Sequence, residues 1–375
     1  MSAMSFDVAA ARNRSEVQQF IKLAASIFRS TETAPEGQSV KSALFSRHRR
    51  MSLVNIIVIK NNSNLVGGCC LIDRRFYWNT KIIRGTFISS VCVDKGARAQ
   101  GASVLLVEAA LKQCQVRETD FALVIARRLV DNYYTKFGFT GVSQYSKVLI
   151  NLSDTRASCS KKFIRIGTEK DFQQCSYAYK ATYSGLLGSC VRSKTDWKHI
   201  YWKLSLLNLH LLVFSSCSSE QIHAYAILRN QDIIEIAGHP SIPLLPVVRC
   251  IGKHLGAPSL VLHIPPQHRL ISELESIDFT VSLRQCSYGG HMVKVINHAR
   301  FKVTPQQTIS PQSSLLELPL TKDMRSFHAP WATRMIKKTS IFADTCNTMG
   351  IRGMSLEDSL NGLPKSFNIP LVDQV

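Results

Sequence analysis

The chain contains 375 residues, of which 45% are hydrophobic, and its 46 lysines and arginines outnumber 26 acidic residues, giving a net charge of +20. This hydrophobic content excludes a disordered chain and is enough for two or three domains. No stretch reaches the roughly 18 consecutive apolar residues of a membrane-spanning helix. Residues 1–7 lack the basic segment that opens a secretory signal. We therefore expect a cytoplasmic protein without a membrane span.

The positive charge is spread along the chain, with +11 in residues 1–150 and +9 in residues 151–375. A field of this sign attracts anions, including phosphorylated cofactors and nucleic acid, and charge alone does not choose among them. The 11 cysteines show neither C-x-x-C spacing nor the spacing of zinc ligands. We expect reduced, mostly buried thiols and no metal site.

The first 150 residues alternate between strand-like and helix-like patterns. The predicted order is strand, helix, three strands, helix, strand, helix, strand. In chain order these are a strand at 6–12, a helix capped by Ser15, strands at 54–59, 65–71 and 82–93, a helix at 101–116, a strand at 121–126, a short helix at 133–139 and a strand at 142–150.

A polar, serine-rich linker at 151–160 separates a second half that opens with the same order of elements. Later strands are predicted at 209–214, 223–228, 233–237, 259–263 and 292–296, with helices at 172–183 and 244–255. We therefore predict an α/β (α+β) chain with two tandem domains of one fold, each built on a mixed sheet. The expected boundaries are 1–152, 160–300 and a C-terminal extension at 301–375.

Residues 86–103 combine an apolar strand, a short basic loop and the start of a long helix. The first amides of a helix lack internal partners and carry partial positive charge, so a loop with Arg98, Gly101, Ala102 and Ser103 suits a phosphate group. The alternative is an ordinary strand-to-helix turn. About 30 residues later comes Tyr133-Tyr-Thr-Lys-Phe-Gly-Phe139, which could also be an aromatic pair that packs a helix on a sheet.

Together the two stretches resemble the Gcn5-related N-acetyltransferase (GNAT) superfamily. The family's cofactor motif, Arg/Gln-x-x-Gly-x-Gly/Ala, corresponds to Arg98-x-x-Gly101-x-Ser103, with Ser103 as a departure. Its second motif corresponds to 133–139. The resemblance covers about residues 5–150 and implies an acetyl-CoA-dependent N-acyltransferase that acts on a primary amine.

The resemblance also implies roles for individual residues. Tyr134 would be the general acid that protonates the departing thiolate of coenzyme A. A backbone amide of the strand that ends at Val93 would polarise the thioester carbonyl. The residues expected to bind acetyl-CoA are Val91, Cys92, Val93, Arg98, Ala99, Gln100, Gly101, Ala102, Ser103 and Asn132. No carboxylate occurs in 87–93, so Asp94 is the candidate base there.

In the second half, Gly188, Arg192, Ser193 and Trp197 resemble the second domain of tandem acetyltransferases of the enhanced-intracellular-survival type. No cofactor motif follows the strand at 233–237, so this domain is expected to be a non-catalytic copy. Its histidines, His239, His263, His268 and His291, are expected to be satisfied structural groups.

Two functions remain open at this point. The first is the N-acetyltransferase, with a small-molecule or peptide amine as acceptor. The second is a catalytically weak or inactive basic protein of this fold that binds nucleic acid or a ribonucleoprotein, motivated by the +20 charge and Ser103. An enzyme that acetylates an amine on or near an RNA would combine the two.

Overall fold

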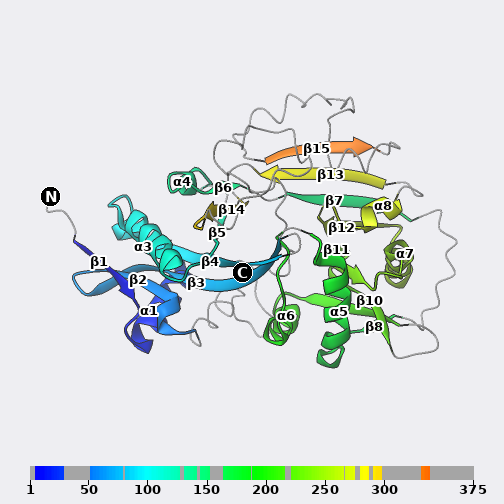
Figure 1. Cartoon of the computed structure of the whole chain (residues 1–375), viewed down its shortest axis with the longest axis horizontal. Coiled ribbons are helices and arrows are strands. Elements are labelled where there is room, and N and C mark those ends of the chain that lie inside the picture. The colour runs from blue at the N-terminus through cyan, green and yellow to red at the C-terminus, as the bar shows by residue number, and fades with distance from the viewer. Residues whose placement is uncertain are drawn as a thin grey trace.

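A computed structural model describes residues 5–28, 51–78, 81–126, 131–141, 144–152, 164–186, 188–215, 221–265, 267–274, 279–286, 290–297 and 331–337. The polar segment 30–50, residues 153–160 of the predicted linker and most of 301–375 lie outside this part. Within it, the chain forms two β-sheets with helices packed on both faces (Figure 1).

The first sheet has the strand order β1-β2-β3-β4-β5-β14-β6 in the described residues. All neighbours are antiparallel except β4 and β5. Its strands are β1 Phe6–Ala10, β2 Ile56–Asn61, β3 Asn64–Trp78, β4 Lys81–Val93, β5 Phe121–Ala126, β6 Thr140–Gly141 and β14 Gly290–Val295. The 3-10 turn η2, Leu53–Asn55, precedes β2, and the 3-10 turn η3, Lys95–Ala97, follows β4.

Two helices cover opposite faces of this sheet (Figure 1). Helix α1, Arg14–Ile27, packs Phe20 against Cys70 and other apolar side chains of one face. Helix α3, Ala102–Val116, packs on the other face, where the short helix α4, Asp131–Thr135, also lies. The residue that caps α1 is Asn13, whose side chain accepts a hydrogen bond from the Glu16 amide, so the sequence prediction of Ser15 was wrong.

The second sheet has the order β15-β13-β7-β12-β11-β10-β9-β8 in the described residues, and β11–β12 is its parallel pair. Its strands are β7 Gln144–Asn151, β8 Ile164–Ile166, β9 Leu209–Ser215, β10 Ile222–Arg229, β11 Asp232–Gly238, β12 Ser259–Ile264, β13 Phe279–Cys286 and β15 Trp331–Lys337. Its helices are α5 Phe172–Tyr183, preceded by the turn η6 Glu169–Asp171, α6 Lys194–Leu206, α7 Leu244–Leu255 and α8 Leu270–Glu273.

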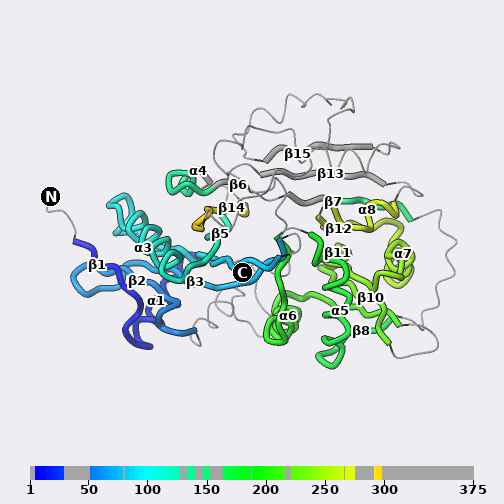
Figure 2. The backbone as a smooth tube through the Cα atoms, viewed as in Figure 1, coloured from blue at the N-terminus to red at the C-terminus, as the bar shows by residue number. Residues whose placement is uncertain are grey.

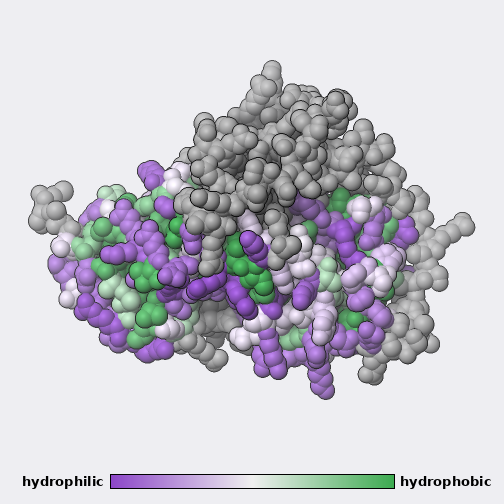
Figure 3. Space-filling model, viewed as in Figure 1, coloured by the Kyte–Doolittle hydropathy of each residue, from purple (hydrophilic) through white to green (hydrophobic). Residues whose placement is uncertain are grey.

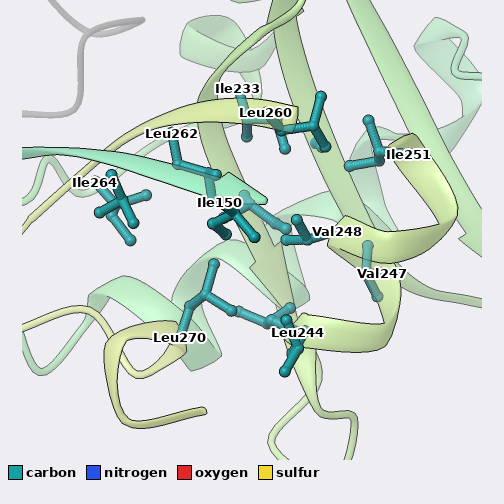
Figure 4. Close-up of a cluster of buried hydrophobic side chains, with 14 of the residues drawn as sticks. Ile150, Ile233, Leu244, Val247, Val248, Ile251, Leu260, Leu262, Ile264 and Leu270 are labelled. Atoms are coloured by element: carbon teal, nitrogen blue, oxygen red, sulfur yellow. The ribbon is translucent and has the colours of Figure 1, made fainter. Parts of the chain in front are cut away.

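The second sheet is also covered on both faces. An aliphatic cluster joins α7 and α8 to the sheet through Leu244, Val248, Leu262 and Leu270 (Figure 4). On the other face, α5 and α6 pack through an aromatic cluster that includes Trp197. The two sheets repeat one topology, which confirms the prediction of two tandem domains of one fold with mixed sheets.

The two halves exchange one strand each. Strand β7 is the last strand of the first half in sequence but lies between β12 and β13 of the second sheet. Strand β14 comes from the second half but lies between β5 and β6, and Figure 2 shows its yellow tube beside cyan strands. The ranges 1–152 and 160–300 therefore each supply one strand to the sheet of the other, and β15 of the C-terminal extension pairs with β13.

A second junction lies at the end of β3, which continues seven residues beyond the predicted Leu71. The backbone of Tyr77 donates to the Ser189 carbonyl at 2.9 Å and accepts from the Gly188 amide at 3.1 Å. Arg74 forms an ion pair with Asp196 at the start of α6. The segment that resembled a second-domain signature thus attaches the second half to the first sheet.

Candidate active site

Strands β4 and β5 pair at one end and separate at the other. Their ladder runs from Gly85 opposite Phe121 to Phe87 opposite Leu123, and no pairing continues beyond it in the described residues. A Cβ at Gly85 would lie 2.4 Å from the Phe121 ring, so glycine is needed where the strands first meet. Ile88–Val93 and Val124–Ala126 therefore border an opening in the sheet.

A β-bulge shapes the β4 side of this opening. Gly68 pairs with Cys92 and Cys70 with Ser89, so Cys69 faces two residues, Ser90 and Val91. Ser90 adopts a left-handed φ of 56°. Bulges of this kind bend a strand and redirect its amides, and they occur often beside active sites.

The loop after β4 forms a concave backbone at the start of α3. Ala99 and Gly101 both have positive φ, of 61° and 84°, and Gly101 is the N-cap of α3 without a side chain to fill the cap. Alternation of this kind turns successive amides towards one point, which suits an anion. The Arg98 Nε donates to the Val93 carbonyl at 3.2 Å and leaves its exposed guanidinium beside the loop.

The remaining loop residues have mainly structural contacts. Ala102 is buried and packs with Val93, while Gln100 donates to the Gly96 carbonyl. The Asp94 carboxylate accepts a hydrogen bond from the Gly96 amide at 2.9 Å and caps the turn η3 at the surface. Its proposed role as a base stays a prediction.

The second motif forms a tight turn against α3. Tyr134 contacts the rings of Tyr133 and Phe139 edge to face, and Gly138 has a φ of 79° that closes the turn. Lys294, on the exchanged strand β14, donates to the Phe137 carbonyl at 2.6 Å. The second half therefore holds the turn that carries Tyr134. Asn132 lies in α4, and its side chain is outside the described residues.

Tyr134 is only 8% exposed, and it lies in the apolar cluster on the α3 face of the sheet. Burial raises its pKa well above the ordinary value, with smaller contributions from Tyr133 and Cys69. Its hydroxyl therefore carries its proton throughout the neutral pH range, as a general acid must.

Two hydroxyl groups join the motifs at the start of α3. The Tyr133 hydroxyl is shielded from water, and burial raises its pKa, while an interaction with the Ser103 hydroxyl partly offsets that rise. Both hydroxyls lie at the start of α3, where the unpaired amides of the helix suit a phosphate group, so these residues fit coenzyme A.

The thiols at the site are poor nucleophiles. Burial raises the pKa of Cys92 to about 12 and that of Cys69 well above its ordinary value. Six cysteines with described side chains are buried and outside any disulfide, as predicted: Cys69, Cys70, Cys92, Cys114, Cys175 and Cys190. Cys250 differs, since it forms a disulfide. The protonated thiols disfavour an acyl-cysteine route and favour direct transfer.

The corresponding place in the second sheet is filled from within the chain. The Glu273 carboxylate accepts a hydrogen bond from the Leu245 amide at 2.8 Å, at the start of α7. Arg269 donates to the carbonyls of His239, Pro240 and Ile242 in the loop before it. A carboxylate of the chain thus occupies the start of α7, whereas the start of α3 has no such side-chain cap; that the second domain is a non-catalytic copy stays a prediction.

Other residues singled out in the second half have structural partners. The Arg192 guanidinium forms two hydrogen bonds to Glu235 and lies over the rings of Tyr179 and Trp197. His239 contacts Ser241, His263 contacts Asp232, and His268 is hydrogen-bonded through both ring nitrogens. The prediction that the histidines are satisfied structural groups is confirmed for these three.

With this geometry in place, comparison with known proteins gives a consistent result. Residues 10–142 match the family model of the acetyltransferase (GNAT) domain. A search of curated proteins gave no match. The chain resembles a GCN5-related N-acetyltransferase from Anabaena variabilis (TM-score 0.60, 14% identity, 79% of this chain and 74% of that one).

Two further solved structures share the fold. One is a probable N-acyltransferase from Enterococcus faecalis, with a TM-score of 0.61 and 12% identity over 78% of this chain and 73% of that one. The other is Eis1 from Mycobacterium abscessus, with a TM-score of 0.54 and 13% identity over 79% and 75%. At these identities the likeness shows the fold.

The match to the acetyltransferase (GNAT) domain covers residues 10–142 of the chain, and the two-sheet fold resembles that of Eis1. This fold supports acyltransferase activity. None of the helices in the described ranges is both long and apolar enough to cross a bilayer.

Proposed function

We propose that the protein is an N-acetyltransferase that transfers an acetyl group from acetyl-CoA to a primary amine by direct attack in a ternary complex. The observation that carries this proposal is the opening between β4 and β5 with the α3 amide cradle at one end and Tyr134 beside it. The buried cysteines support direct transfer over a covalent enzyme intermediate.

Each part of the site has a task in this reaction. Arg98 and the amides from Ala99 to Ser103 would bind the pyrophosphate, and Asn132 of α4 is a further residue expected to hold the cofactor. The β4 edge from Val91 to Val93 would pair with the pantetheine arm. Acetyl-CoA supplies the activated thioester. An amide at the bulge stabilises the developing oxyanion, and Tyr134 protonates the leaving sulfur.

Calorimetric titration with coenzyme A tests the cofactor site without knowledge of the acceptor. We expect one molecule to bind per chain, because Glu273 fills the corresponding helix end in the second sheet. Hydrogen bonds to charged groups contribute about 1.5–3 kcal/mol, so Arg98→Gln should raise the Kd roughly 10- to 100-fold. Arg229→Gln, exposed on the second sheet, is the control. Absence of binding to the wild type would overturn the proposed function.

A second candidate role is supported by the charge. Arg75 and Arg84 are direct cross-strand partners on the β3–β4 hairpin, both exposed, and neither forms an ion pair within the described residues. Like charges in this position repel each other unless an anion lies between them. Figure 3 shows hydrophilic residues over much of the described surface on the visible face. We propose that an anionic acceptor or nucleic-acid partner contacts this pair.

Fluorescence anisotropy with a labelled single-stranded RNA tests this role. Phosphate-driven binding weakens steeply with salt, so affinity should fall as salt rises. The double variant R75Q/R84Q should bind more weakly than the control K22Q/R229Q, which loses the same charge from exposed sites elsewhere. Equal losses in the two variants would mean that the binding is diffuse and would contradict a site at the hairpin.

A further inference from the structure

The strand exchange brings a histidine of the second half to the first sheet. His291 lies on β14, where its Cα pairs with that of Ile125 on β5. The last β4–β5 pair is Phe87 with Leu123, so the same register two residues further along places Ser89 opposite Ile125. His291 therefore lies one strand away from the opening, at the level just past the point where the ladder ends.

Side-chain alternation places His291 on a defined face. Val293 packs with Phe121 and Leu123, whereas Met292 packs in the cluster beneath α3. Successive residues of a strand point to opposite faces, so His291 shares the face of Val293 and Ile125. Ile125 is 37% exposed there, while His291 is only 5% exposed.

Tyr134 and the α3 amides lie on the opposite face. Coenzyme A held at those amides would occupy the α3 side of the opening. An acceptor amine then has to approach from the other side, which is the face that carries His291. The acid and the histidine thus flank the opening from opposite faces of the sheet.

We propose that His291 accepts the proton that the acceptor amine loses, an assignment that rests on the proposed acetyltransferase function. The amine nitrogen forms its bond to the acyl carbon while the carbon–sulfur bond breaks. One amine proton passes to the imidazole, directly or through one water, and the Tyr134 proton passes to the sulfur. This supplies the base that 87–93 lack.

An alkylating cofactor analogue tests the placement without an identified acceptor. Bromoacetyl-CoA carries its reactive carbon next to the acyl position, and a nearby imidazole nitrogen bonds to that carbon as bromide leaves. We expect mass spectrometry of the wild-type protein to find the label on His291. H291Q should lose the label and keep its affinity for coenzyme A, while H263Q, on the second sheet, should keep both.

The outcomes separate the two proposals. Label on another residue, or none, in protein that binds coenzyme A would overturn the role of His291 and leave the proposed function intact. Failure to bind coenzyme A would remove both. If H291Q does not fold, the labelled position in the wild-type protein, together with its protection by excess coenzyme A, still decides the question.

Discussion

Replacing Tyr134 by phenylalanine is expected to lower kcat about 10²- to 10⁴-fold, the range that general acid catalysis contributes. The substitution removes one oxygen and keeps the ring, so the edge-to-face contacts with Tyr133 and Phe139 remain. The cradle at Arg98–Ser103 is untouched, and the Kd for coenzyme A should stay within experimental error. Release of free thiol in a panel of primary amines measures the rate.

The matched control is Tyr177→Phe, which removes the same atom from an exposed tyrosine on α5. It should leave kcat and thermal stability unchanged. Because burial raises the pKa of Tyr134, the wild-type acid keeps its proton at alkaline pH, so the rate should not fall at the ordinary tyrosine pKa. A Tyr134→Phe variant with wild-type kcat would remove Tyr134 from the mechanism.

The sequence predicted local elements well where one pattern dominated. Strand β5 and helix α5 begin and end at the predicted residues. The end of β3 was missed because Asp73-Arg-Arg75 interrupts its apolar run. Only the structure shows that this stretch is half buried, with Phe76 packed in the core and Arg74 paired with Asp196. Where the polar positions of an alternating strand are charged, the sequence pattern resembles that of a loop, and the end of the strand is hard to predict.

Strand partners could not be predicted in the same way. Hydrophobic alternation shows that 292–296 forms a strand, but it carries no information on which sheet accepts it. The exchange of β7 and β14 therefore had no signal in the sequence. For the same reason, Lys294 at the Tyr134 turn and His291 beside β5 were assigned to the second half alone.

The side chains at the start of α7 could not be predicted from the sequence. The missing Arg-x-x-Gly-x-Gly indicated a degenerate copy. The groups found there instead are Arg269, which precedes α8, and Glu273, the last residue of α8, about 30 residues beyond the loop. A side chain that caps a helix from a distant segment cannot be recognised in the sequence next to that helix. Arg98 and Gly101 could be recognised because they directly precede α3.

The largest effect on stability is expected at the pair formed by Arg192 and Glu235, whose side chains are 1% and 0% exposed. Arg192→Met leaves the Glu235 carboxylate buried without its cation, while the Tyr225 hydroxyl still donates a hydrogen bond to it at 2.6 Å. Breaking a buried pair in this way typically costs about 3–5 kcal/mol. We expect that loss in the free energy of unfolding, measured by urea denaturation.

The double variant R192M/E235M separates the charge from the packing. Removing both charges relieves the desolvation penalty, so the double variant should be more stable than Arg192→Met alone. Lys198→Met breaks the exposed pair with Glu169 and should change stability by less than about 1 kcal/mol. Since Val191 donates its amide to the Arg75 carbonyl, loss of the Arg192 anchor should also loosen the contact with β3. Faster amide hydrogen exchange at Val191 would show that this contact is weaker. If R192M/E235M is instead less stable than Arg192→Met, the packing of Arg192 on Tyr179 and Trp197 contributes more to stability than the charge pair does.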